Sequence, residues 1–187
     1  SAKNFVNAMN PDIKIETHQQ YVDKDNIINL ISDYDIVADG TDNFASRFLI
    51  NDACYLASRK LVSAAVLRFD GQLSTFKAFE PDVTGQFGPC YRCIFNPPPP
   101  ADVSNSCSEA GVLGALCGVM GSLQAVEVIK ELLDVGDSLS GILMLYEGLT
   151  GTLRRIKVKP DPECQLCGES PTITDLSIHS NCSGENA

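Results

Sequence analysis

The sequence predicts an α/β fold whose sheet begins with parallel strands and continues into antiparallel ones. Short apolar runs alternate with helical patterns in the first third of the chain, as is typical of parallel strands joined by helices. Turn residues at Asp70-Gly71 and at Thr150-Gly151 separate later strand patterns, which predicts antiparallel hairpins. Two Cys-x-x-Cys pairs also indicate that a metal ion closes the fold.

The N-terminal elements follow from periodicity and proline. A helix is expected over residues 1–9, and it ends before Asn10-Pro11 because a residue that precedes proline disfavours helix. Alternation over 13–17 predicts a strand, and an amphipathic pattern over 24–32 predicts a short helix.

The central segment predicts a strand–helix–strand unit followed by a hairpin. We expect a strand over 36–39, a helix over 43–59 and a buried parallel strand over 61–67. The turn at Asp70-Gly71 then leads into a return strand over 73–79.

The second half predicts one long helix and a second hairpin. Residues 97–100 are four prolines, which break regular structure, and the helical pattern of 109–133 follows. Its row of small residues, Gly114, Gly118 and Ser122, indicates tight core packing or a dimer contact. We expect strands over 141–146 and 152–158, and a polar tail over 169–187.

Composition limits the classes of partner. The 187 residues carry a net charge of −10, which disfavours nucleic acid and anionic membranes as partners. No apolar run is long enough to span a membrane, and no signal peptide is visible, so we expect a cytoplasmic protein. Only two histidines are present, which argues against a His-based catalytic triad.

Polar side chains cluster where the strand predicted over 36–39 ends. Ligands of open α/β sheets bind beyond the carboxyl ends of the strands. Carboxylate and amide oxygens there suit a magnesium ion and phosphates. The alternative is that Asp42 or Asn43 only caps the following helix. The residues expected to project at this edge are Asp39, Thr41, Asp42 and Asn43.

Four cysteines have the spacing of a structural zinc site. Cys90 and Cys93 form one Cys-x-x-Cys pair, and Cys164 and Cys167 form the other. Two such turns can place four thiolates around one tetrahedral ion and leave no open coordination position. The alternatives are redox-active pairs or surface thiols. Disulfides are less consistent with an α/β pattern that lacks a signal peptide.

The remaining cysteines differ in their surroundings. Ser106 and Glu109 have the spacing of a capping box, which would place Cys107 in the first turn of the long helix. A helix N-terminus favours thiolate, so Cys107 is a candidate nucleophile, with an inert surface thiol as the alternative. Cys54 and Cys117 lie in apolar helical patterns and are expected in the core, and Cys182 lies in the tail.

Taken in order, these motifs resemble the HesA/MoeB/ThiF family, the ubiquitin-activating-enzyme-like sulfur-carrier adenylyltransferases. The resemblance covers residues 39–168 and leaves out the tail, so residues 1–168 are expected to be the family domain. The motifs that carry it are Asp39-Gly-Thr-Asp-Asn43 with Arg47, Asn51-Asp-Ala-Cys54, Asp70-Gly-Gln72, Cys90-Tyr-Arg-Cys93, Ser108-Glu-Ala-Gly-Val-Leu-Gly114, Gly118-Val-Met-Gly-Ser-Leu-Gln-Ala125 and Cys164-Gln-Leu-Cys-Gly168.

The resemblance implies a Rossmann-like sheet and a specific reaction. ATP with Mg²⁺ would adenylylate the C-terminal Gly-Gly carboxylate of a small ubiquitin-like sulfur-carrier protein, and the enzyme would be a homodimer. Asp42 matches the family's acidic residue for magnesium and the phosphates, and Asn43 matches its neighbour in the nucleotide site. Cys107 matches a cysteine used by some members, and the four paired cysteines match the zinc ligands.

The family's N-terminal glycine-rich segment is not found in this chain. In the strand order 3-2-1-4-5, the strand at 13–17 would be the third, and no segment provides strand two beside it or strand one beside the strand at 36–39. We therefore expect a gap in the sheet and an intact protein that is longer or completed by a second piece. We also expect weak ATP binding by this chain alone.

Three functions remain open at this point. A MoaD-like carrier would place the enzyme in molybdopterin synthesis, which we favour, and a ThiS-like carrier would place it in thiamine synthesis. The chain could instead be a non-catalytic, zinc-closed module for binding or dimerisation. The distal half of a nicotinamide-dependent dehydrogenase is disfavoured by the paired cysteines and the lack of a catalytic histidine.

Overall fold

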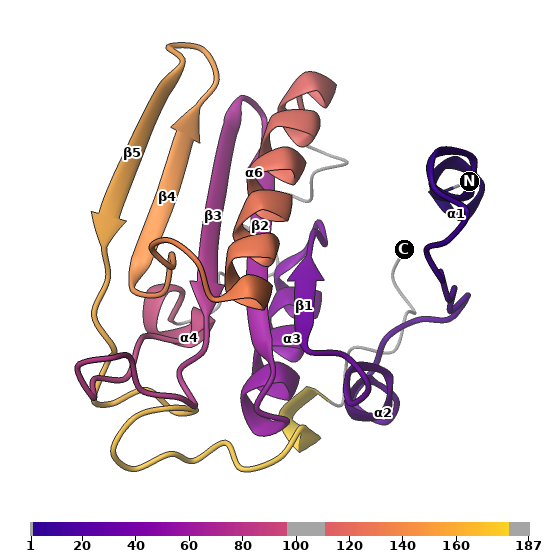
Figure 1. The fold of residues 1–187 in the computed structure, drawn as a ribbon. Coiled ribbons are helices and arrows are strands. Elements are labelled where there is room, and N and C mark those ends of the chain that lie inside the picture. The colour runs from indigo at the N-terminus through magenta and orange to yellow at the C-terminus, as the bar shows by residue number, and fades with distance from the viewer. Residues whose placement is uncertain (1, 97–110, 180–187) are drawn as a thin grey trace.

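A mixed five-stranded sheet forms the centre of the computed structural model, which describes residues 2–96 and 111–179 (Figure 1). Its strand order is β1-β2-β3-β4-β5. The predicted change from parallel to antiparallel pairing is confirmed, although the sheet of the described residues is not mostly parallel. Only β1 and β2 pair in parallel, and the other three pairs are antiparallel.

The helices lie on both faces of this sheet, with α6 on one face and α3 on the other (Figure 1). The strands are β1 (Ile36–Asp39), β2 (Lys60–Leu67), β3 (Asp70–Phe76), β4 (Ile142–Glu147) and β5 (Thr152–Lys157). The helices are α1 (Ala2–Met9), α2 (Ile27–Ile31), α3 (Phe44–Leu56), α4 (Tyr91–Ile94), α6 (Gly114–Leu133) and the 3₁₀ turn η1 (Ser177–His179).

The prediction of a strand over residues 13–17 is wrong. This segment forms neither helix nor strand, and Ile13 is 50% exposed. An extended segment needs a neighbouring strand to satisfy its backbone groups. Among the described residues, no strand pairs with the free edge of β1, so the alternating pattern has no partner to bind. Because no parallel neighbour extends the sheet of the described residues beyond β1, three of its four strand pairs are antiparallel. The helix predicted at the N-terminus is present as α1, which buries no residue.

The β1–α3–β2 unit forms as the sequence predicts. β1 and β2 pair in parallel through Asp39 and Ser63, and α3 covers them from one face. Apolar residues of α3 pack against β2 and β3 in the larger core cluster. Its buried members are Ile27, Ile31, Phe48, Leu49, Ala53, Cys54, Leu61, Phe76, Tyr91 and Leu176.

The first hairpin forms, but its turn lies two residues earlier than predicted. Leu67 pairs with Asp70, so Arg68 and Phe69 form the turn, and Arg68 has a φ of 54°. Gly71 is instead buried in β3, where a Cβ atom would lie 2.5 Å from Sδ of Met120. The glycine is required there because α6 packs closely against β3.

The long helix starts later than predicted. Residues 111–113 bridge to the hairpin turn, since Arg68 N donates to Gly111 O and Leu113 N donates to Arg68 O. Helix α6 begins only at Gly114, and Ser106 and Cys107 lie outside the described residues. The row Gly114, Gly118 and Ser122 is exposed and does not pack in the core, which leaves the dimer contact a prediction.

The C-terminal part of the described chain packs onto the domain. Ile173, Leu176 and His179 are buried, although they lie in the segment predicted as a polar tail. The division at residue 168 stays a prediction. Within the described ranges, no helix has the length and apolar character needed to cross a membrane.

Candidate functional site

Asp39, the last residue of β1, forms hydrogen bonds that fix the chain at the carboxyl end of the strand. Asp39 is buried, and its Oδ1 accepts hydrogen bonds from Thr41 N at 2.9 Å and Thr41 Oγ1 at 2.8 Å. Its Oδ2 accepts from Ser63 Oγ of β2 at 2.8 Å. The Asp39 side chain therefore fixes the turn after β1 and is not free to bind a ligand.

Asp42 and Asn43 lie at the start of α3, where the sequence predicted them. The side chain of Asn43 caps the helix by accepting from Ser46 N at 2.8 Å. Its Nδ2 also donates to Asp42 Oδ1 at 3.2 Å. Asp42 is exposed, and within the described ranges its side chain accepts a hydrogen bond from Asn43 alone. The capping alternative therefore holds for Asn43 and not for Asp42.

Arg47 of α3 holds the same turn from the helix side. Its Nε and Nη2 donate to Thr41 O at 3.1 Å and 2.6 Å. The guanidinium also lies over the ring of Phe44, 5.7 Å from the centroid. The turn between β1 and α3 is thus fixed by one side chain from each of the two elements that it joins.

Gln124 connects α6 to the strand ends from the opposite face. Its Nε2 donates to Asp39 O at 2.8 Å and to Val62 O at 2.9 Å. A cavity of about 230 Å³ lies between this part of α6 and the turn. Its lining comprises Gly40, Thr41, Asp42, Arg47, Ala64, Ala65, Val66, Val112, Cys117, Met120, Gly121 and Gln124.

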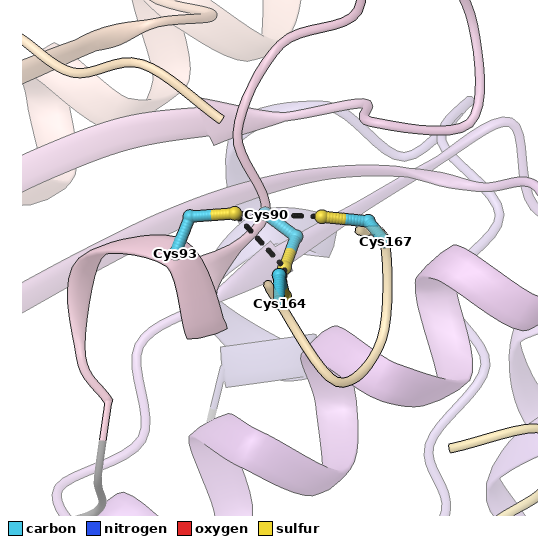
Figure 2. Close-up of side chains that lie close together, drawn as sticks. All are labelled: Cys90, Cys93, Cys164 and Cys167. Carbon is cyan, nitrogen blue, oxygen red and sulfur yellow. Dashed lines mark hydrogen bonds between the residues drawn. The ribbon is translucent and has the colours of Figure 1, made fainter. Parts of the chain in front are cut away.

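The two Cys-x-x-Cys pairs come together in the structure, and their sulfur atoms face one another (Figure 2). The four Sγ atoms all lie within 4.8 Å of one another, with three separations of 3.4, 3.6 and 3.9 Å. A tetrahedral zinc–thiolate site with bonds of about 2.3 Å requires sulfur separations of about 3.8 Å. The donor set and its spacing therefore fit one tetrahedral ion. These four residues are Cys90, Cys93, Cys164 and Cys167.

A buried polar network holds the first cysteine pair against α3. Asn51 Oδ1 accepts from Tyr91 N at 2.9 Å. Arg92 binds Asp52 with two hydrogen bonds, Nε to Oδ1 at 2.8 Å and Nη2 to Oδ2 at 2.6 Å. Because Tyr91 and Arg92 lie between the cysteines of that pair, the Asn51-Asp52 dipeptide fixes where Cys90 and Cys93 lie.

The same carboxylate also holds the C-terminal segment. His179 Nε2 lies 2.8 Å from Oδ2 of Asp52. Burial alone would raise the pKa of Asp52, but hydrogen bonds from His179 and Arg92 hold that pKa below its ordinary value. Asp52 is therefore ionised at neutral pH, and an ionised carboxylate only accepts, so His179 donates.

The other cysteines differ in exposure to solvent, and some of them lie outside the described residues. Cys54 is buried as predicted, and burial raises the pKa of its thiol to about 12. The prediction that Cys117 is buried is wrong, because the sheet-facing side of α6 is formed by Leu116 and Met120 and leaves Cys117 exposed beside the cavity. Cys107 and Cys182 lie outside the described residues.

Sequence reasoning did not find the hydrogen-bond network around this site. Asp39 was expected to face a ligand, and Gln124 and His179 were given no role. The contacts of Asp39 with Ser63, of Gln124 with Asp39 and of His179 with Asp52 join residues that lie far apart in the sequence, and Gln124 lies 85 residues from Asp39. Local patterns carry no signal for such pairs, although a half-buried glutamine in an apolar helix stands out.

Comparison with known proteins places the chain in a family. A profile described as the ThiF family matches residues 1–166. A sulfur carrier protein adenylyltransferase of Thermus thermophilus is 41% identical over 175 residues, which cover 94% of this chain and 64% of that protein. An adenylyltransferase and sulfurtransferase MOCS3 of Bos taurus is 42% identical over 188 residues, which cover 100% of this chain and 40% of that protein.

Solved structures show the same fold at low sequence identity. A crystal structure of E. coli MccB matches 90% of this chain and 49% of its own chain, with a TM-score of 0.72 at 15% identity. A structure of E. coli MccB with ATP matches with a TM-score of 0.69 at 14% identity. This chain thus spans less than two thirds of the length of the relatives and structures named here. On its profile match and its relatives above 40% identity, this chain belongs to the ThiF family.

Proposed function

We propose that the whole protein adenylylates the C-terminal Gly-Gly carboxylate of a small ubiquitin-like sulfur-carrier protein. In this reaction a carboxylate oxygen forms a bond to the α-phosphorus of ATP, and pyrophosphate leaves. The observation that carries the proposal is the exposed Asp42 carboxylate beside the 230 Å³ cavity at the end of β1. The two relatives described above are named adenylyltransferases, which supports the reaction class.

The oxygen chemistry of the turn supports the role of Asp42. Mg²⁺ would supply the charge that neutralises the phosphates, and it prefers oxygen ligands such as carboxylates. Asp42 Oδ1 accepts a hydrogen bond from Asn43, which orients the carboxylate and leaves its other oxygen available. Asn43 itself is committed to the helix through Ser46 N, so it would contact the nucleotide through its amide nitrogen.

We propose that the four-cysteine cluster holds a structural zinc ion. Its donor set and spacing support this assignment, and four thiolates leave no position for a substrate. The cluster joins the start of α4 to the segment beyond β5, so zinc would close the chain onto the domain. Zinc coordination by thiolates requires reduced cysteines, so this assignment accords with our proposal of a cytoplasmic protein.

Two further assignments rest on the family resemblance. Cys107 would take part in acyl transfer after adenylylation, and two copies of the protein would form a homodimer. The exposed small-residue row of α6 is a candidate contact for the second copy. We propose the molybdopterin-pathway carrier as the substrate, with the thiamine-pathway carrier as the alternative.

The decisive experiment is carrier-dependent exchange of labelled pyrophosphate into ATP by the whole protein. We expect exchange with a MoaD-like carrier and none with the same carrier lacking its last Gly-Gly. Asp42→Ala should abolish exchange, while Asp134→Ala, an exposed site at the far end of α6, should retain it. Exchange retained in Asp42→Ala would contradict the site assignment, and preference for a ThiS-like carrier would favour the alternative pathway.

A further inference from the structure

Arg47 occupies a position that is unfavourable for a cation. It lies in the first turn of α3, whose N-terminal end carries the positive pole of the helix dipole. The side chain is only 6% exposed, so the guanidinium has lost most of its contact with water. Arginine in such a place requires compensating contacts, and those contacts indicate what it does.

The compensation comes from one backbone carbonyl rather than from a carboxylate. Nε and Nη2 of Arg47 both donate to Thr41 O, and the guanidinium also lies over the Phe44 ring and interacts with the Tyr91 hydroxyl. The ion pairs of the described ranges do not include Arg47. A buried cation directed at a single carbonyl fixes the position of that carbonyl strongly, because charge-assisted hydrogen bonds are about twice as strong as neutral ones.

The carbonyl that Arg47 holds belongs to the peptide unit that leads into Asp42. Thr41 N belongs to the planar peptide unit before Thr41 and Thr41 O to the planar unit after it, so fixing both atoms sets the direction in which the chain enters Asp42. Asp39 holds the nitrogen side of Thr41, and Arg47 holds the carbonyl side. Gly40 has no heavy atom within 4 Å of where a Cβ would lie, so side-chain packing around this residue does not restrain the turn.

We propose that Arg47 is a positioning residue for Asp42. By fixing the peptide plane between Thr41 and Asp42, it aims the Asp42 carboxylate at the cavity where the metal-bound phosphates of the nucleotide would lie. Arg47 acts through Asp42 and makes no bond to the reacting atoms. This inference rests on the proposed function of the site.

Arg59 provides a matched control. It follows the C-terminal end of α3, is half-buried, and donates from Nη2 to a backbone carbonyl, Ser32 O, at 2.7 Å. That carbonyl follows α2 and lies away from the cavity. Equivalent substitutions at Arg47 and Arg59 therefore remove the same type of bond near the turn and far from it.

The first test compares kcat and KM for carrier-dependent pyrophosphate exchange by the whole protein. We expect Arg47→Met to lower kcat by about 100-fold, since a misplacement of about 1 Å has effects of this size. Arg47→Lys retains one donor and should lose about 10-fold, which is partial rescue by the conservative variant. Neither variant should change KM for the carrier, and Arg59→Met should keep kcat within about twofold of wild type.

The second test is a double-mutant cycle between Arg47→Met and Asp42→Asn. If Arg47 acts through Asp42, the double variant should be no slower than Asp42→Asn alone. Multiplying losses would overturn the proposal, and so would wild-type kcat in a folded Arg47→Met. If Asp42→Asn alone retains full activity, it is the proposed function of the site that fails, so the two failures are distinguishable. Circular dichroism and denaturant unfolding of each variant establish that the compared proteins are folded.

Discussion

Asp52 of α3 and Arg92 of α4 form a buried ion pair across 40 residues of sequence, with Arg92 Nη2 2.6 Å from Asp52 Oδ2. The carboxylate is fully buried, and His179 donates to the same oxygen. The Asp52 carboxylate of α3 thus contacts α4, which follows Cys90 and contains Cys93, and it also contacts His179 at the end of the described chain.

We predict that Asp52→Asn destabilises the protein by about 3–5 kcal/mol, because it leaves the buried Arg92 cation without its partner. The free energy of unfolding from urea titration, with saturating zinc, measures this loss. Asp25→Asn is the control, since Asp25 pairs with Lys24 at the surface and should cost less than about 1 kcal/mol. Equal losses in the two variants would contradict a structural role for the buried pair.

The same pair makes stability depend on pH. The folded-state pKa of Asp52 lies below its ordinary value of 3.8, so its stabilisation is fully present above that value. It is lost as the pH falls through the lower, folded-state pKa. The difference in unfolding free energy between wild type and Asp52→Asn should therefore be constant from neutral pH down to about pH 5 and shrink below the ordinary value. A difference that widens on acidification would contradict the assignment of the ionised form.

We predict one zinc ion per chain in protein purified without chelator. Elemental analysis of Cys90→Ser should show loss of zinc, and its melting temperature should fall strongly, since structural zinc sites contribute on the order of 10 kcal/mol to folding. Cys54→Ser is the control, because Cys54 is buried outside the cluster and should retain the metal. Zinc-free protein whose four clustered cysteines are oxidised would show that the pairs form disulfides instead.

Gly71→Ala should destabilise the protein by about 1–3 kcal/mol, because its Cβ would overlap the side chain of Met120. Met120→Val in the same chain should recover part of this loss by shortening the opposing side chain. Gly118→Ala is the matched control on α6, where no heavy atom lies within 4 Å, and it should stabilise the helix by up to about 1 kcal/mol. A change of sedimentation coefficient in Gly118→Ala would instead reveal that a second copy contacts this row.

The thiols of Cys117 and Cys54 should differ in alkylation rate by at least about 100-fold at neutral pH, because Cys117 is exposed and Cys54 is buried with a pKa of about 12. Peptide mapping by mass spectrometry after timed iodoacetamide treatment measures both rates. Because Cys117 lines the cavity, Mg-ATP should slow its alkylation in the whole protein if the nucleotide lies there. Comparable rates for the two thiols in folded protein would contradict the burial of Cys54.

The sequence predicted the elements whose patterns are local and the cluster whose spacing is distinctive. The β1–α3–β2 unit, both hairpins and the cysteine quartet were all predicted. Errors arose where a distant element decides the conformation. Gly71 was placed in a turn because Asp-Gly favours one, but the approach of Met120 requires the glycine inside β3. The segment over 13–17 alternates like a strand, yet pairing also requires a neighbour.

By itself, the sequence determined the type of fold, the four cysteines that cluster and the position of Asp42 after a strand, because periodicity and Cys-x-x-Cys spacing are properties of neighbouring residues. Only the tertiary structure decided what holds Asp42 in place. Asp39 of β1, Arg47 of α3 and Gln124 of α6 all bind the backbone at the strand ends. Asp52 binds Arg92 of α4 and His179 of η1. Such contacts join residues that are distant in the sequence, so a buried polar group reaches its hydrogen-bond partner only when the whole fold has formed.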